Sequence, residues 1–349
     1  MSLERTNLRS GYDVPRLVVG LWQLSEGHQR RPTHRGEALS TLARLADSGF
    51  TTFDCADIYT GVETLLGEFR AGYVASRGGG APPLRIHTKF VPNRDALASL
   101  DRRHVERIID RSLARLGVDR LDLVQFAWWD YAVPGYVETA LWLDELRETG
   151  KIRLLGVTNF DVTRLQEIVE SGVPVATNQV QYSLLDRRVE SGMAEFCATH
   201  DIRLLCYGTL GGGFLSRRYL RAEPPEPPFA NRSLTKYRLM IDEAGGWGRF
   251  QDLLDIMGAI ARDHDCAVAQ VALRWVLDRP SVASAIVGFA DTARLEVCAD
   301  ALDLRLSEED HSLLAGWAAS GPMPGGDVFE LEREPGGAHA SIMRYDLNA

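Results

Sequence analysis

The sequence is poor in the features that mark several protein classes. Its 349 residues include five cysteines, and none of them has metal-ligand spacing or the pairing of a small secreted domain. Acidic residues outnumber basic ones, 48 to 39, so the chain lacks the basic face that nucleic-acid binding needs. No apolar run approaches the ~18 residues of a membrane span, and the polar start has no signal-peptide core. We therefore expect a cytoplasmic protein with no metal, nucleic-acid or membrane role.

The glycine fingerprint of a Rossmann domain is also missing. No GxGxxG follows an apolar run, and the Gly211–Gly212–Gly213 triplet does not have that spacing. A doubly wound dinucleotide-binding domain is therefore not supported.

What the chain does contain is a regular alternation of short apolar runs and longer segments with the 3.6-residue period of amphipathic helices. The runs lack strict apolar–polar alternation, which is typical of parallel strands buried on both faces. The predicted strands are 16–21, 51–56, 85–90, 121–127, 153–159, 175–180, 203–208 and 284–288. Eight strand–helix units predict an α/β fold, the (β/α)8 TIM barrel, which typically spans ~250 residues.

The chain is longer than a minimal barrel, and the excess lies in the first dozen residues and in two longer segments. We expect a single domain over residues 1–349 with its core at about 16–300. One surplus segment, 209–247, follows the seventh strand and is rich in Gly, Pro and Arg, as lids and binding loops often are. The other is a C-terminal tail at 320–349, expected to cap the active-site end of the barrel or a neighbouring subunit. The sequence does not determine the oligomeric state.

Three reactive residues stand at the C-terminal ends of predicted strands, where barrel enzymes carry their functional groups. Asp54 and Tyr59 follow the second strand, and Lys89 ends the third. A free tyrosine has a pKa near ~10, and a nearby ammonium group lowers it. An aspartate that pairs with the lysine keeps the lysine charged and in place. Together they predict a general acid that protonates an oxygen receiving hydride.

Six motifs make this interpretation specific: FDCADIY…LLG, the TK of IHTKF, DLVQFAWWD, GVTNF, NQVQYS and YGTLGGGFL. In order and spacing, over roughly residues 16–300, they resemble the strand-end motifs of the aldo-keto reductase superfamily. The resemblance implies a barrel that binds extended NADPH without a Rossmann domain and reduces a small-molecule substrate. By position it makes Tyr59 the proton donor, with Lys89 and Asp54 tuning it.

The same resemblance implies a set of cofactor-binding residues. Thr158, Asn159 and Gln179 would hydrogen-bond the nicotinamide carboxamide, and Tyr207 would stack on the nicotinamide ring. Gly208 and Leu210, from YGTLGGGFL, also belong to the cofactor-binding set that the resemblance implies.

The adenosine end matches the family less well. The family commonly places a basic residue, a serine and a later arginine around the 2′-phosphate. Here Gly288 and Phe289 occupy the first two positions, and Arg294 fits the third. One arginine can still bind a phosphate bidentately. The preference for NADPH over NADH is thus implied by the resemblance more than by these residues.

The chain departs from the family at Ala127, where the resemblance places a histidine that binds the substrate carbonyl oxygen. Alanine cannot donate a hydrogen bond, and losing one such donor costs ~3 kcal/mol of transition-state stabilisation, about a hundredfold in rate. Four interpretations remain: a slow or specialised carbonyl reductase, a reductase of conjugated C=C or C=N bonds, a catalytically silent NADPH-binding regulatory protein, and a carbonyl reductase inactivated by an engineered alanine. Retention of Tyr59, Lys89 and Asp54 favours an enzyme.

Two further features surround this position. His87 is on the same face of its strand as Lys89 but ~6–7 Å deeper, so we interpret it as a hydrogen-bonded core histidine. Trp22, Trp128 and Trp129 are predicted to form an aromatic wall for a flat or apolar substrate, the alternative being packing at the barrel rim.

Overall fold

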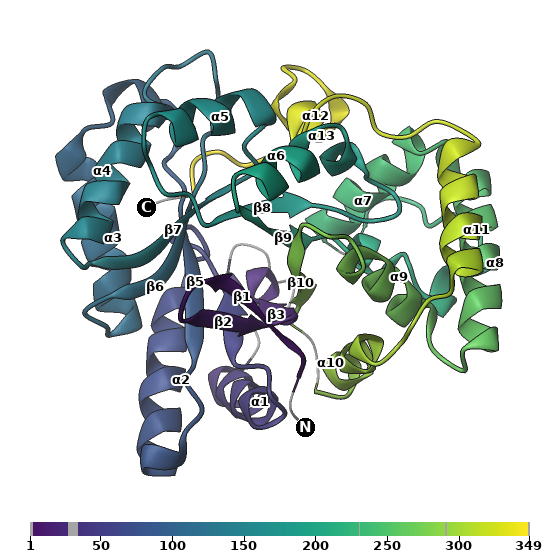
Figure 1. The fold of residues 1–349 in the computed structure, drawn as a ribbon, viewed down its shortest axis with the longest axis horizontal. Helices are drawn as coiled ribbons and strands as arrows, with labels where there is room; N and C mark the ends of the chain where they lie inside the picture. Colours follow the sequence, from purple (N-terminus) through teal and green to yellow (C-terminus); the bar gives the residue numbers. More distant parts are fainter. Residues whose placement is uncertain (1–2, 27–33, 230, 290–291, 348–349) are drawn as a thin grey trace.

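A closed barrel of eight parallel strands forms the centre of the molecule (Figure 1). The computed structural model describes residues 3–26, 34–229, 231–289 and 292–347. The barrel strands are β3 (Leu17–Gly20), β4 (Thr52–Asp54), β5 (Arg85–Phe90), β6 (Leu121–Phe126), β7 (Ile152–Thr158), β8 (Thr177–Gln181), β9 (Arg203–Tyr207) and β10 (Val282–Gly288). They pair in chain order, and β10 closes the barrel against β3. Each predicted run overlaps one strand, so the predicted (β/α)8 fold is confirmed.

Helices surround the barrel and cover the outer faces of its strands. Those that connect successive strands are α1 (Arg35–Asp47), α2 (Val62–Arg77), α3 (Arg102–Leu116), α4 (Tyr136–Glu148), α5 (Val162–Glu170), α6 (Met193–Thr199) and α9 (Val268–Leu277). The connection from β9 to β10 also contains α8 (Gly246–Asp263), and α10 (Thr292–Ala299) and α11 (Glu308–Ala319) follow β10. Short 3-10 turns are η1 (Trp22–Leu24), η2 (Gly78–Gly80), η3 (Arg94–Ser99), η4 (Arg188–Glu190), η5 (Gly211–Gly213), η6 (Arg217–Tyr219) and η7 (Asp300–Leu302). In the described part of the chain, no helix is long and apolar enough to cross a bilayer.

Local sequence explains where helix α3 begins and ends. The side chain of Asp101 accepts a hydrogen bond from the His104 amide, which caps the first turn of α3. Gly117 then ends α3 in the left-handed conformation, with φ of +62°. Between them, Val105, Ile109 and Leu116 are among the residues that bury one face of the helix.

An N-terminal hairpin covers the end of the barrel opposite to the strand ends that carry the candidate site. It consists of β1 (Arg5–Arg9) and β2 (Tyr12–Pro15), which are antiparallel. The Tyr12 hydroxyl lies 3.1 Å from His87 Nε2, and burial lowers the pKa of His87 to about 4. The interpretation of His87 as a hydrogen-bonded core residue is confirmed.

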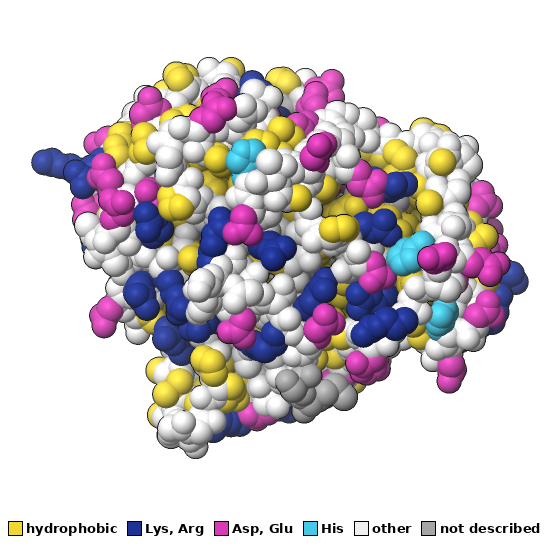
Figure 2. All heavy atoms as spheres, viewed as in Figure 1, with side chains coloured by type: hydrophobic (Ala, Val, Ile, Leu, Met, Phe, Trp, Pro, Cys, Tyr) yellow, Lys and Arg dark blue, Asp and Glu magenta, His cyan; other side chains and the backbone are white. Residues whose placement is uncertain are grey.

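Charges of both signs lie over this end of the molecule. Figure 2 shows Lys and Arg side chains around the hairpin with acidic side chains among them. Arg5 pairs with Asp13, and Arg9 Nη1 lies 2.6 Å from Asp201 Oδ2. These arginines are therefore engaged in local ion pairs.

The two surplus segments both contain ordered structure. The loop after β9 carries α7 (Arg232–Glu243), and the tail carries α12 (Glu330–Arg333) and α13 (Ala338–Ser341). Asp327 Oδ2 accepts a hydrogen bond from the Val162 amide at the start of α5. The tail therefore packs on its own barrel, at the end where β7 stops and α5 begins.

Candidate functional site

The predicted aspartate and lysine meet inside the barrel mouth. Asp54 is the last residue of β4, and Lys89 is the penultimate residue of the neighbouring strand β5. Lys89 Nζ lies 2.5 Å from Asp54 Oδ2 and donates a second hydrogen bond to the Cys55 carbonyl, at 2.8 Å. Burial lowers the pKa of Lys89, but the charges of Asp54 and Tyr59 and the hydrogen bond to Asp54 together outweigh burial, so the net shift is upward. The lysine therefore stays protonated.

Tyr59 lies in the loop between β4 and α2, beside this pair. The Lys89 ammonium is 5.2 Å from the centroid of the Tyr59 ring, and the Trp22 ring is 4.8 Å away on centroids. Burial raises the pKa of Tyr59 more than the charge of Lys89 lowers it, and the resulting pKa is about 12. The expectation that the lysine brings this pKa below that of free tyrosine is therefore wrong, because the loss of hydration is the larger effect.

Two glutamine side chains complete the coordination of the Asp54 carboxylate. Asp54 Oδ1 accepts hydrogen bonds from Gln125 Nε2 at 3.0 Å and from Gln179 Nε2 at 2.7 Å. Gln179 Nε2 also lies 3.0 Å from Gln125 Oε1. Four side chains from β4, β5, β6 and β8 thus form one buried network that fixes the lysine.

Ala127 follows the last residue of β6, at the rim of the same mouth. Its amide donates to the carbonyl of Phe90, the residue after Lys89, at 3.0 Å. The residue is 9% exposed, and its methyl group offers no hydrogen bond. Position 127 therefore shapes the mouth without contributing a polar group.

A second cluster lies at the ends of β7, β8 and β9. Thr158 Oγ1 and the Asn159 amide both donate to the Gln179 carbonyl, at 3.0 Å and 2.9 Å. The Tyr207 hydroxyl donates to Asn159 Oδ1 at 2.9 Å. The structure thus brings together the four residues that the sequence assigned to the nicotinamide.

Gly208 and Leu210 stand just beyond this cluster, in the loop that leads to η5. Gly208 has φ of +72°, and a Cβ there would lie 2.5 Å from the Tyr237 hydroxyl. Both facts make a side chain at position 208 unfavourable. Arg294, the expected 2′-phosphate ligand, is exposed on α10, and residues 290 and 291 just before that helix lie outside the described residues.

The three predicted wall tryptophans do not share one environment. Trp22 is partly exposed and packs against Tyr59. Trp129 is partly buried, and its ring meets the ring of Tyr345 edge-on at 5.2 Å. Trp128 is 1% exposed, and its Nε1 donates to the carbonyls of Asp130 and Val133, both at 3.0 Å. Trp128 therefore belongs to the packing of the rim, and its placement in an open wall is wrong because its indole N–H is satisfied by its own loop.

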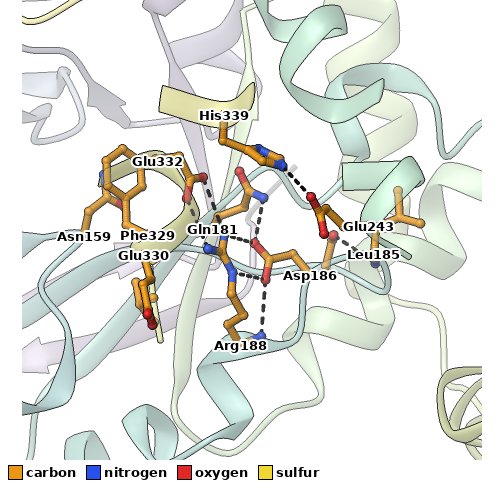
Figure 3. A network of polar contacts seen from close by, with 12 residues as sticks. Asn159, Gln181, Leu185, Asp186, Arg188, Glu243, Phe329, Glu330, Glu332 and His339 are labelled. Atoms are coloured by element: carbon orange, nitrogen blue, oxygen red, sulfur yellow. Dashed lines mark hydrogen bonds and ion pairs between the residues drawn. The ribbon is translucent and has the colours of Figure 1, made fainter. Parts of the chain in front are cut away.

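A buried charge network joins the tail to the cofactor side of the mouth (Figure 3). Glu332, with an exposed fraction of 0%, lies 3.1 Å from Arg188 Nη1 and 3.2 Å from Lys236 Nζ. Arg188 also pairs with Asp186 at 2.7 Å, and Asp186 accepts from Gln181 Nε2 at 2.7 Å. Burial raises the pKa of Glu332, but Lys236 and Arg188 outweigh it and lower that pKa to about 2. The carboxylate is therefore ionised and holds α12 in place.

Comparison with known proteins identifies the fold family. The sequence model of the Aldo/keto reductase family matches residues 16–318. The chain belongs to this family. Flagellar radial spoke protein 5 of Chlamydomonas reinhardtii is 31% identical over 299 residues, covering 69% of this chain and 56% of that protein. Aldo-keto reductase YhdN of Bacillus subtilis (strain 168) is 26% identical over 308 residues, covering 86% of this chain and 89% of YhdN.

Solved structures of other aldo-keto reductases are also similar. A thermostable aldo-keto reductase in complex with the inhibitor epalrestat is 26% identical with a TM-score of 0.70, covering 90% of this chain and 100% of that one. The enzyme from Klebsiella pneumoniae, in complex with NADP and acetate, is 25% identical with a TM-score of 0.66, covering 91% of this chain and 95% of that one.

Three residues that contribute to the mouth of this aldo/keto reductase were not singled out from the sequence. Gln125 stands two positions before Ala127 in the otherwise apolar stretch 123–127, and that polar interruption was a usable signal. Tyr237, under Gly208, and Arg333, in the tail, lie in segments whose position the sequence does not specify. The family match ends at residue 318, so it gives no guide to the tail either.

Proposed function

We propose that the protein is an NADPH-dependent reductase that delivers hydride to a carbonyl, or to a conjugated C=C or C=N bond, of a small aromatic or apolar substrate. The observation that carries this proposal is the position of Tyr59 beside a lysine whose ammonium is fixed by the buried Asp54. A tyrosine needs no such partner in a protein that only binds or only folds.

The donors and acceptors around Asn159 suit a nicotinamide carboxamide. Asn159 Oδ1 already accepts from Tyr207, so its Nδ2 is the group that donates to the carboxamide oxygen. Gln179 Nε2 is bonded to Asp54 and Gln125, so Gln179 presents its Oε1 to the carboxamide nitrogen. Thr158 donates its hydroxyl proton to the Gln179 carbonyl, so its oxygen can only accept a hydrogen bond from the carboxamide. Bound NADPH supplies the hydride, and the Klebsiella pneumoniae relative is a complex with NADP.

The Tyr59 hydroxyl is the proton donor of the proposed reaction. A pKa of about 12 keeps it protonated at neutral pH. Hydride addition to a carbonyl leaves an alkoxide, which is more basic than a phenolate, so proton transfer from Tyr59 is downhill. Lys89 then stabilises the phenolate that remains, because the two groups already lie side by side.

Ala127 lowers the expected rate of simple carbonyl reduction. Without an imidazole beside Tyr59, one hydrogen bond to the carbonyl oxygen is absent, which costs ~3 kcal/mol. A simple aldehyde therefore reacts slowly, while an enone or imine gains space to place its acceptor carbon under the hydride.

A catalytically silent NADPH-binding protein is the second candidate. The alanine at position 127 favours it, and so does the similarity to a relative whose name, Flagellar radial spoke protein 5, states no catalytic activity. This candidate predicts cofactor binding without turnover of any acceptor.

The deciding experiment compares NADPH oxidation by the parent protein, Ala127→His and Tyr59→Phe with a panel of aromatic aldehydes, ketones, enones and imines. For an altered reductase, the parent turns over an enone or imine, Ala127→His loses that activity, and Tyr59→Phe loses turnover while still binding NADPH. A parent inactive throughout, with a histidine variant that gains at least tenfold on aldehydes, identifies a reductase that lacks its aligning group. If neither the parent nor Ala127→His turns over any acceptor, the silent candidate is supported.

A further inference from the structure

We propose that Arg333, in the C-terminal tail, is a positioning residue for the nicotinamide site, and that it couples that site to the substrate side of the mouth. This inference rests on the proposed function. It concerns a part of the chain beyond residue 318, where the match to the aldo/keto reductase family ends.

The contacts of Arg333 reach both halves of the mouth. Its Nη2 donates to the Asn159 carbonyl at 2.8 Å and to the Trp128 carbonyl at 3.0 Å. Asn159 directly follows β7, on the cofactor side, and Trp128 directly follows Ala127, on the substrate side. One guanidinium nitrogen therefore ties the ends of two neighbouring strands together. Hydrogen bonds from a charged donor are among the stronger ones in proteins.

Asn159 depends on such a contact because its backbone is unusual. Its φ is +59°, in the left-handed region that non-glycine residues seldom adopt. The Gln179 carbonyl holds the Asn159 amide on one side of the residue, and Arg333 holds its carbonyl on the other. Both peptide groups that flank Asn159 are thus held, and the Tyr207 hydroxyl holds its side-chain Oδ1.

The guanidinium itself is held in place by its surroundings. Its carbon lies 4.2 Å from the centroid of the Tyr131 ring and 5.1 Å from that of Phe329. The preceding residue, Glu332, pairs with Arg188, as Figure 3 shows, and also with Lys236. The tail therefore delivers Arg333 as a preorganised group rather than as a mobile side chain.

The ion pair between Glu332 and Lys236 also reaches Tyr207, another residue expected to contact the nicotinamide. Lys236 Nζ, paired with Glu332, lies 5.2 Å from the centroids of both the Tyr207 and the Phe329 rings. Tyr207 in turn donates its hydroxyl proton to Asn159. Consecutive tail residues thus act on two of the four residues expected to contact the nicotinamide, one through a backbone carbonyl and the other through a neighbouring lysine.

The test separates positioning of the nicotinamide from general stability. Dissociation constants are measured for NADPH and for 2′-phospho-ADP-ribose, which has the same adenosine end but no nicotinamide, or for NADH and ADP-ribose if the protein prefers NADH. We expect Arg333→Ala to weaken NADPH binding by about tenfold, the loss of one charge-assisted hydrogen bond, and to leave 2′-phospho-ADP-ribose binding unchanged.

Arg344→Ala is the matched control, because Arg344 is an exposed arginine of the same tail. It should change neither constant. If Arg333→Ala does not fold, Arg333→Lys carries the test, since it keeps the charge but shortens the reach, and a smaller loss confined to NADPH is expected. Equal losses for both nucleotides, no loss for either, or the same selective loss in Arg344→Ala overturn the inference. A parent that binds neither nucleotide overturns the proposed function, and this inference with it.

Discussion

Lys89 and Asp54 form an ion pair whose two charged groups are 2.5 Å apart and whose side chains are 7% and 5% exposed. A buried ammonium beside a buried carboxylate is stable only while both are present. The pair therefore sets both the charge of Lys89 and its position beside Tyr59.

Asp54→Asn is expected to lower kcat for the proposed reduction by at least tenfold, because Lys89 loses the charge that holds it protonated. Asp54 raises the pKa of Lys89, so its removal lowers that pKa. The rate of the variant should then fall, as pH rises, at a lower pH than the rate of the parent. A pH profile of kcat measures this. Asp13→Asn, which removes a half-exposed partner of Arg5, should leave the profile unchanged.

Gly208→Ala is expected to destabilise the protein and weaken cofactor binding. The substitution combines a φ of +72° with a Cβ 2.5 Å from the Tyr237 hydroxyl. Gly213→Ala is the matched control, since its φ is +100° but nothing lies within 4 Å of its Cβ. We expect Gly208→Ala to cost about 1–3 kcal/mol more free energy of unfolding than the control, the usual cost of overpacking. Equal losses in denaturant titrations would contradict the clash.

The lowered pKa of Glu332 predicts that acid reduces the stability of the fold. Its folded-state pKa, about 2, is below the ordinary value of 4.5, so ionised Glu332 stabilises the fold above the higher value. That contribution, on the order of 3 kcal/mol, is lost as pH falls from about 4.5 towards 2. Glu332→Gln should be less stable than the parent at neutral pH, and the difference should shrink as the solution is acidified. A difference that stays constant from pH 6 to pH 3 in thermal unfolding would count against this ion network.

The sequence by itself determined the barrel and the positions of its principal polar residues. Strand identity follows from short, largely apolar runs of five to seven residues, and the place of Asp54 or Lys89 follows from its being near the end of such a run. Because parallel strands in a barrel all point the same way, their ends meet at one mouth, and residues far apart in the chain are predicted together.

Only the tertiary structure decided how those residues are used. The direction of the Tyr59 pKa shift depends on how much water the surrounding rings exclude, which no local pattern records. Trp128 turned into the rim because its N–H found two carbonyls of its own loop. Arg333 bonds Asn159 across 174 positions of sequence, and such a contact exists only once the barrel has closed and the tail has packed over it. Local preferences act over a few residues, whereas these features arise from long-range packing and burial.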